Sequence, residues 1–313
     1  MTYCIDSVSF NLLKEVKMTY INNVGLTPRR FFNLAQVLAY NLRKRYLELE
    51  KSGRALMGQM NQFGESSVIA DWELEEAVIK FWQATGFKIG WITEEHGSFN
   101  LKGAEYVAYL DGLDGSRVYV EGEGGRCGTM LGMYLAGKPD FSGYLGSLLV
   151  DYGQRETGGD NTLIAAAGLG AWVDDTEEQG KYIKVQVDNS PKSHKKLIAY
   201  ADLYFAPVRQ AATHLPKVKF IYLKASLPYY VDLVEGYSWL VLECTRKHSL
   251  EIAAAYPLVH EAGGVMVDVN SGKELGKLDR SIANTHGRLI VSTTNLDIAT
   301  KLRDELYPLT IKR

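Results

Sequence analysis

The sequence predicts an α/β (α+β) fold built from layers of helices and sheets. Two amphipathic helical patterns come first, and several short apolar runs bounded by glycine and aspartate follow them. In the second half, strand-like and helix-like segments alternate, which places helices against the faces of a sheet. The length of 313 residues suits two domains or one large one.

The two helices near the start are predicted from apolar periodicity. Apolar residues recur at helical spacing over residues 31–49, with Pro28 before them and Gly53 after them. A second helix is expected over residues 71–85 and should end at Gly86, because glycine is common at the residue where a chain leaves a helix.

The remaining elements are predicted from short apolar runs separated by turn residues. Strands are expected at FKIGWIT, EYVAYLD, GTMLGMYLA and GYLGSLLVDYG, with a strand pair within TLIAAAGLGAWVDD. Further strands are expected at KLIAYAD, KFIYL, SWLVLEC, VMVDV and RLIVST. Helices are expected at ASLPYYVDLVEG, SLEIAAAYPLVHEAGG and NLDIATKLRDEL. A polar segment, DDTEEQGKY, suggests a boundary between two subdomains, residues 1–180 and residues 181–313.

Composition and charge argue against several classes of function. The net charge of −2 gives no reason to expect binding to a nucleic acid polymer or a membrane surface. Cys4, Cys127 and Cys244 share no close spacing, so neither a structural zinc site nor a disulfide framework is expected. We see no secretory signal and no apolar run long enough to cross a bilayer, and we expect a soluble, cytoplasmic protein.

The segment YLDGLDGSRVY, from Tyr109 to Tyr119, carries the clearest chemical signal. Asp111 ends a strand and Asp114 follows after one tight turn, which the intervening glycine helps the backbone to make. Two ionised carboxylates this close repel each other unless a cation lies between them. Oxygen ligands without Cys or His favour a hard cation such as Mg²⁺. An Asx turn, in which aspartate caps its own backbone, is the alternative that stays open.

Other groups suggest an anion site beside these carboxylates. Backbone N–H groups at Gly115 and Ser116, where a turn opens a helix, form a site for a phosphate. Glu94 follows a strand and Glu251 lies in the first turn of an apolar helix. Taken singly, Glu94 reads as an exposed acid and Glu251 as compensation of a helix dipole. Metal ligands next to an anion site would together hold a phosphate ester.

These motifs resemble those of the inositol monophosphatase-like family of metal-dependent sugar phosphatases. The family pattern D-P-x-D-G-[TS] is matched by Asp111-Gly-Leu-Asp114-Gly-Ser116. The family pattern W-D-x-A-A-G followed by E-A-G-G is matched by residues 250–255 and 261–264. A G-E-E after a strand is matched by Thr93-Glu94-Glu95, and a T-D that opens a helix by Ala70-Asp71. The resemblance runs from about residue 30 to the end of the chain.

The chain departs from the family pattern at three positions. Glu251 stands where the family usually has Asp, Leu250 replaces Trp, and Gly112 replaces Pro. The longer Glu251 side chain implies either a slightly shifted helix or an altered second metal site.

The resemblance implies a layered αβαβα sandwich of the sugar phosphatase type with two subdomains. The N-terminal one would carry the acidic motif, and the C-terminal one Glu251 and the residues on the substrate side. Two to three Mg²⁺ per site and a homodimer are also implied.

Carried over position by position, the resemblance assigns roles to individual residues. The metal ligands would be Glu94, Asp111, the Leu113 carbonyl, Asp114 and Glu251. The phosphate would be held by backbone amides of Gly115 and Ser116. The attacking water would be oriented and deprotonated by Glu94 and by the Ser116 hydroxyl, which Asp71 supports. Lys224 and Glu243 would contact the substrate.

We therefore predict a Mg²⁺-dependent phosphomonoesterase that hydrolyses a small-molecule ester, namely a sugar or polyol phosphate. Fructose 1,6-bisphosphate is one candidate if Lys224 contacts a second phosphate rather than solvent. A nucleotide phosphatase for 3′-phosphoadenosine phosphate or NADP is an alternative, in which Tyr229 and Tyr230 stack on a base instead of packing in the core. A non-catalytic relative that binds a phosphorylated ligand is the other alternative, and the motif departures motivate it.

Overall fold

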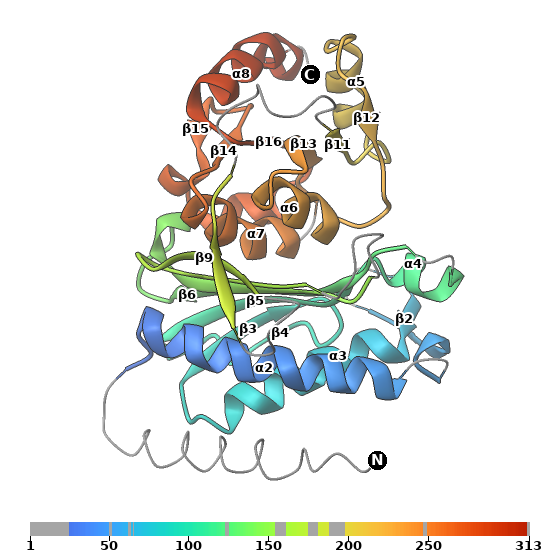
Figure 1. Cartoon of the computed structure of the whole chain (residues 1–313), viewed down its shortest axis with the longest axis vertical. Coiled ribbons are helices and arrows are strands. Elements are labelled where there is room, and N and C mark those ends of the chain that lie inside the picture. Colours follow the sequence, from blue (N-terminus) through green and yellow to red (C-terminus); the bar gives the residue numbers. More distant parts are fainter. Residues whose placement is uncertain are drawn as a thin grey trace.

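The chain folds into five stacked layers of helix, sheet, helix, sheet and helix, as the computed structural model in Figure 1 shows. The structure describes residues 25–49, 52–61, 64, 66–122, 125–153, 161–174, 181–187, 198–246 and 249–311. Across these residues the predicted αβαβα sandwich is confirmed.

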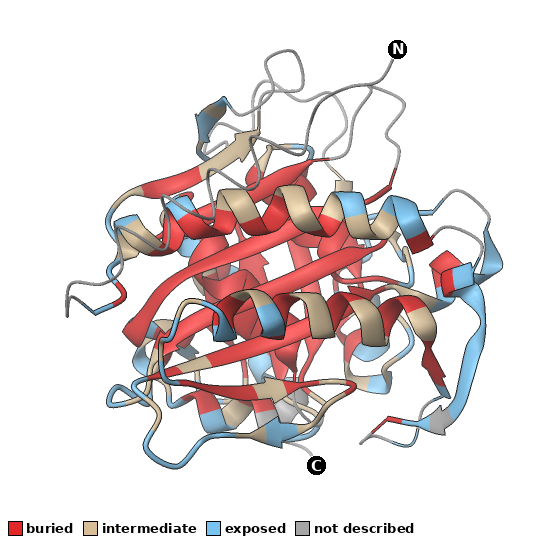
Figure 2. Ribbon diagram, turned by 90° about the horizontal axis from the view of Figure 1, so that it is seen from below, coloured by how far each residue is buried: buried red, intermediate tan, exposed pale blue. Residues whose placement is uncertain are grey.

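Helices α2 (Pro28–Leu49) and α3 (Ile69–Gln83) form the first layer and were both predicted. Their apolar stripes face the first sheet, and Figure 2 shows their buried sides against its strands. Burial of such a stripe supplies most of the stability of an amphipathic helix. Gly86, just beyond α3, has a φ of 79°, the conformation for which glycine was expected there.

The second layer is a sheet whose order, within the described residues, is β10-β9-β8-β7-β6-β5-β3-β4. Strands β3 and β5 are parallel, and the other neighbours are antiparallel. The bounds are β3 Ile89–Thr93, β4 Ser98–Phe99, β5 Tyr106–Asp114, β6 Gly128–Leu135, β7 Tyr144–Asp151, β8 Thr162–Ala166, β9 Gly170–Asp174 and β10 Tyr182–Val185. The predicted strand pair at residues 162–174 is confirmed as β8 and β9.

Helices α6 (Leu227–Val234) and α7 (Leu250–Glu261) form the third layer, between the two sheets. Both helices are almost wholly buried, because each has a sheet on one side and a sheet or helix on the other. Helix α7 therefore carries apolar residues all round, as its sequence indicated.

The fourth layer is a sheet of order β12-β11-β13-β16-β14-β15 in the described part of the chain. Its strands are β11 Ile198–Ala201, β12 Phe220–Ile221, β13 Ser238–Cys244, β14 Val265–Asp268, β15 Lys273–Glu274 and β16 Leu289–Thr293. Helices α5 (Ala206–Thr213) and α8 (Leu296–Ile311) cover its outer face. The sequence did not predict α5, whose short segment has few large apolar residues, or the hairpin of β1 (Leu56–Met60) and β2 (Ser66–Val68).

The cysteines and the subdomain boundary fall only partly within the structure. Cys127 and Cys244 are buried and form no disulfide within the described part of the chain, whereas Cys4 and residues 175–180 lie outside it. The first sheet ends with β10 and the second begins with β11, and the division at residue 180 stays a prediction. None of the helices in the described part of the chain has the length and apolar character needed to span a bilayer.

A β-bulge in strand β5 decides where the acidic motif points. Asp111 pairs with Met130 and Asp114 with Gly128, so one extra residue is inserted on β5 between them. Residues three apart on a regular strand face opposite sides of the sheet, and the inserted residue restores a common side. Both carboxylates therefore face the third layer, where Glu251 lies, and the intervening Leu113 packs into the core on the α3 side.

We expect Gly112→Ala to lower the free energy of unfolding by about 1–3 kcal/mol, because the site has no room for a methyl group. A Cβ at residue 112 would lie 2.5 Å from the Asp71 carbonyl oxygen and 2.7 Å from Glu75 Cγ. Gly137→Ala is the matched control, since a Cβ there meets no atom within 4 Å. Urea unfolding with metals chelated measures both variants, and equal losses would contradict the proposed clash.

Candidate active site

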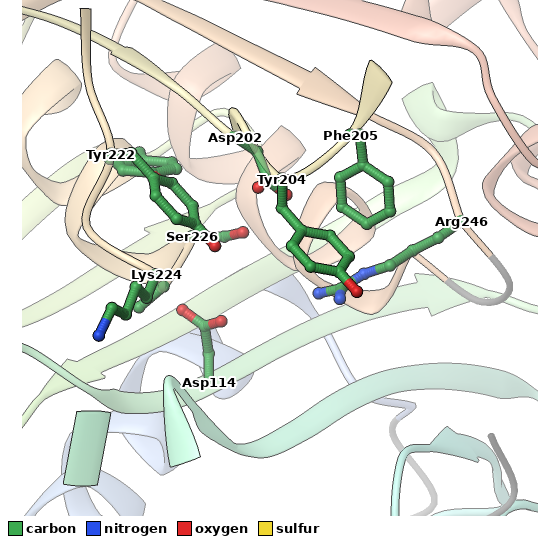
Figure 3. Close-up of a pocket in the computed structure, with 10 residues that line it drawn as sticks. Asp114, Asp202, Tyr204, Phe205, Tyr222, Lys224, Ser226 and Arg246 are labelled. Atoms are coloured by element: carbon green, nitrogen blue, oxygen red, sulfur yellow. The ribbon is translucent and has the colours of Figure 1, made fainter. Parts of the chain in front are cut away.

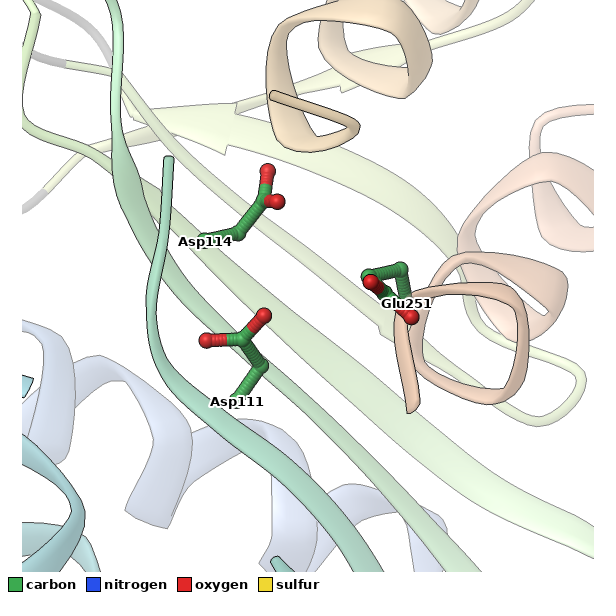
Figure 4. Close-up of side chains that lie close together, drawn as sticks. All are labelled: Asp111, Asp114 and Glu251. Carbon is green, nitrogen blue, oxygen red and sulfur yellow. The ribbon is translucent and has the colours of Figure 1, made fainter. Parts of the chain in front are cut away.

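Three buried carboxylates, two from β5 and one from α7, converge above the bulge of β5. One oxygen of each of Asp111, Asp114 and Glu251 lies within 4.8 Å of the others. Figure 4 shows the two aspartates rising from β5 and Glu251 reaching toward them from the start of α7. The fold thus brings together residues far apart in sequence, as the hypothesis of a shared site required.

The position of Glu251 follows from the way α7 begins. Ser249 precedes the helix, and Glu251 lies in the first turn, where unpaired N–H groups favour a negative charge. The helix-dipole reading of Glu251 and its place in the acidic group are therefore compatible. The backbone N–H of Arg246 donates to Ser249 Oγ at 2.9 Å, which ties the preceding loop to the same helix end.

Two further carboxylates lie close to this group: Asp71 on α3 and Glu94 in the loop after β3. Burial and then the charge of Glu94 raise the pKa of Asp71 well above its usual value. The same two causes, in the same order, raise the pKa of Asp111, to which Asp114, Asp71 and Glu251 also contribute. Glu94 and Asp71 are therefore electrostatic neighbours of the convergent group, although they come from different elements.

Asp114 is held at the junction of the first sheet and α6. Its Oδ2 accepts a hydrogen bond of 2.5 Å from the backbone N–H of Leu227, the first residue of α6. Burial and then the charge of Glu251 raise the pKa of Asp114 to about 7. Asp111 Oδ1 accepts from the Leu113 N–H at 3.0 Å, so the Asx-type bond left open by the sequence is present together with the acidic group.

Glu75 holds the loop that carries Glu94, and the sequence analysis did not single it out. This fully buried carboxylate accepts from the backbone N–H of Glu94 at 2.8 Å and of Glu95 at 3.0 Å. Its other oxygen accepts from the N–H of His96 at 3.1 Å and lies 2.8 Å from His96 Nδ1. Glu75 is one helical turn beyond Asp71, on the same face of α3, a spacing that marks two acids at core positions.

A pocket opens beside Asp114 on the side of the second sheet (Figure 3). Acidic, basic and aromatic side chains line it together, which suits a ligand that has both a ring and charged groups. The lining comprises Asp114, Asp202, Tyr204, Phe205, Tyr222, Lys224, Ala225, Ser226, Tyr229 and Arg246. Sequence reasoning missed Asp202 and Arg246, because nothing in their local patterns indicates that the chain returns them to Asp114.

The two residues predicted to contact substrate occupy different places. Lys224 lines the pocket, but its Nζ donates to Glu121 at 2.9 Å, and Figure 3 shows it directed away from Arg246. Glu243 is buried behind the pocket wall and accepts hydrogen bonds from Ser226 and Tyr230. Within the described residues, Glu243 therefore contacts the pocket through Ser226 rather than lining it itself.

The turn predicted to bind phosphate begins the short helix α4 (Ser116–Glu121). Gly115 has a φ of 83°, and a Cβ there would lie 2.8 Å from the Ala225 Cβ. Glycine is therefore required both by the backbone conformation and by the close approach of the pocket wall.

The sequence model of the inositol monophosphatase family matches residues 32–305. The chain belongs to this family. The matched residues include the whole acidic motif, and the family is one of phosphatases, as the motif resemblance implied. No curated protein sequence matches the chain.

Solved structures share the fold at low sequence identity. An inositol monophosphatase from Anabaena (Nostoc) sp. PCC 7120 is 18% identical with a TM-score of 0.65, covering 90% of this chain and 96% of that one. A fructose-1,6-bisphosphatase from Leishmania major is 15% identical with a TM-score of 0.66, covering 97% and 98%. A structure described as inositol monophosphatase–fructose 1,6 bisphosphatase is 21% identical with a TM-score of 0.64, covering 88% and 98%.

We expect Glu75→Gln to lower the free energy of unfolding by about 2–3 kcal/mol. The carboxylate accepts hydrogen bonds from three backbone N–H groups, and the NH₂ of the glutamine amide cannot accept them. Amide hydrogen exchange at residues 94–96 should accelerate in the same variant. Glu73→Gln is the matched control on the same helix, where a partly exposed pair with Arg45 contributes less than about 1 kcal/mol. Unchanged exchange at residues 94–96 in Glu75→Gln would show that Glu75 does not hold this loop.

With metals chelated, the protein should lose stability as the pH rises from about 4 to about 7. The pKa of Asp114 is about 7 when folded and lower when unfolded, so the folded state retains a proton that the unfolded state has lost. The free energy of unfolding therefore falls with pH across this window. Asp114→Asn should remove at least about 1 kcal/mol of this fall in urea unfolding measured at pH 5 and pH 8. Asp304→Asn, on the outer helix α8, should retain the wild-type slope, and equal slopes in both variants would contradict the assignment.

Proposed function

We propose that the protein is a Mg²⁺-dependent phosphomonoesterase that hydrolyses a small sugar or polyol phosphate. The observation that carries the proposal is the convergence of Asp111, Asp114 and Glu251, which are buried and within 4.8 Å of one another. Membership of a phosphatase family supports the reaction class. Burying like charges is costly, and a divalent cation is the simplest group that offsets this cost.

The residues at the site fit a hard divalent cation. The converging side chains offer carboxylate oxygens, and no His or Cys of the described residues joins the group. Asp71 Oδ1, on the α3 side of β5, is buried and has no hydrogen-bond partner among the described residues, so its capacity to accept a bond is unused. We propose that Glu94, Asp111, the Leu113 carbonyl, Asp114 and Glu251 hold two to three Mg²⁺.

The chain's own residues divide the remaining tasks. When bound, the cations would neutralise the carboxylates, activate water and stabilise charge on the phosphoryl oxygens. The backbone N–H groups of Gly115 and Ser116 would bind the phosphate and fix its orientation. Glu94 and the Ser116 hydroxyl, supported by Asp71, would orient the attacking water and accept its proton. This role suits Glu94, since Glu75 fixes the backbone of its loop.

The pocket beside Asp114 would receive the rest of the substrate. For Lys224 to contact a second phosphate it would have to leave Glu121, so a bisphosphate substrate requires the exchange of one ion pair for another. A nucleotide phosphate is the second candidate, because Tyr204 and Tyr222 are 71% and 39% exposed and lie at the pocket. Tyr229 and Tyr230 are fully buried, as core packing requires, so the exposed tyrosines are the better candidates for stacking.

A screen of phosphate esters tests the proposal. We expect phosphate release that requires Mg²⁺ and that Asp114→Asn reduces by at least about 1000-fold, because the variant removes a charged ligand of the site. The esters should include inositol, fructose, histidinol and nucleotide phosphates, with mutual competition to separate sugar from nucleotide substrates. Asp304→Asn should keep wild-type turnover, since that residue lies on the outer helix.

Two results would count against the proposal. Normal turnover by Asp114→Asn would show that the acidic group is not the reaction centre. Thermal stabilisation by phosphate esters without release of phosphate would favour the non-catalytic relative. The homodimer and the cytoplasmic location stay predictions.

A further inference from the structure

Arg246 makes an ion pair with Glu251 at the edge of the acidic group. We propose that Arg246 shields Glu251 in the free protein and contacts the phosphoryl oxygens of the ester when cations and substrate bind. This inference rests on the proposed function. It assigns to the site a fixed positive charge that the motif resemblance did not include.

The position of Arg246 allows both contacts. Its Nη2 bonds the Oε1 atom of Glu251, while its side chain is 43% exposed and lines the pocket with Asp114. Figure 3 shows the Arg246 guanidinium and the Asp114 carboxylate entering the same pocket from different elements. The residue is therefore open to a ligand although its partner Glu251 is buried.

Its surroundings keep the guanidinium at this place. The backbone N–H of Arg246 is anchored to Ser249, and its guanidinium carbon lies 5.8 Å from the centre of the Phe205 ring. A cation over an aromatic face is attracted to it, so Phe205 would support the guanidinium after it leaves Glu251. A planar guanidinium with several N–H donors also matches two phosphate oxygens at once.

Charge balance supports an exchange of partners. Glu251, Glu94 and Asp114 all raise the pKa of Arg246, so its charge acts on the whole acidic group. A divalent cation at Glu251 competes with the guanidinium for the same carboxylate, and two positive groups at one carboxylate repel each other. The cation would thus drive Arg246 toward the incoming phosphate dianion, whose negative charge replaces that of Glu251.

The longer arm of Glu251 is consistent with this arrangement. The extra methylene, relative to the aspartate usual in the family, lets one carboxylate reach both the aspartates of β5 and Arg246. Glu251 in place of aspartate and the presence of Arg246 would then be linked, because the longer side chain is what allows the ion pair.

Titration calorimetry with Mn²⁺ alone, followed by inorganic phosphate at saturating Mn²⁺, tests the proposal. The proteins are the full-length wild type, Arg246→Met, Arg246→Lys and Arg303→Met. The last is the matched control, because it removes an arginine paired with an acid on the outer helix α8. We expect Arg246→Met to bind Mn²⁺ at least about tenfold more tightly and phosphate at least about tenfold more weakly. Arg246→Lys should fall between wild type and Arg246→Met in both affinities.

Several outcomes overturn the proposal. Unchanged Mn²⁺ and phosphate affinities in Arg246→Met would show that the pair with Glu251 is only structural. Weaker binding of both probes, with Arg246→Lys equally impaired, would show that Arg246 shapes the site without competing for Glu251. A wild type that binds no Mn²⁺ overturns the proposed function as well, whereas normal Mn²⁺ binding and turnover with an unaltered Arg246→Met overturns only this inference.

Discussion

Repulsion among buried carboxylates is the constraint on which the rest of this structure depends. Asp111, Asp114 and Glu251 each place one oxygen within 4.8 Å of the others, and Asp71 on α3 and Glu94 after β3 add their charges. Ionised groups so placed destabilise the fold unless protons, an arginine or bound cations offset them. The pKa values of Asp71, Asp111 and Asp114 are raised by burial and by this repulsion. The packing of the surrounding layers must therefore keep the carboxylates together despite their repulsion.

The layers do so through close backbone approach. The bulge in β5 turns both aspartates toward α7, and the missing side chain at Gly112 lets α3 come within contact of the same strand. Glu75 then fixes the loop that carries Glu94, while the first turn of α7 presents Glu251. The site is therefore supported by two helices on opposite faces of one sheet, an arrangement that leaves its carboxylates little freedom to separate.

The pocket beside Asp114 is built differently from the acidic group. Its walls come from α6 and from the segments that follow strands of the second sheet, and they include exposed tyrosines, Asp202 and two basic residues. A shared fold at 15–21% identity fixes the layers but not this lining. Under the proposed function, residues of this lining such as Tyr222 and Arg246 would select the ester.

The sequence by itself determined the layered fold class, the main helices and strands, and the acidic motif, because these follow from local periodicity, turn residues and short spacing. It also placed Glu251 in a first helical turn. The short helix α5 was not predicted, because its segment lacks a strong apolar pattern. Glu75 was not predicted, because a single acid at a core position of a helix does not by itself indicate a role. Only the tertiary structure brought Glu251 to Asp111 and Asp114, set Arg246 against Glu251, and placed Glu243 behind Ser226. Those relations join residues distant along the chain, and their geometry is set by how the layers pack rather than by any local preference.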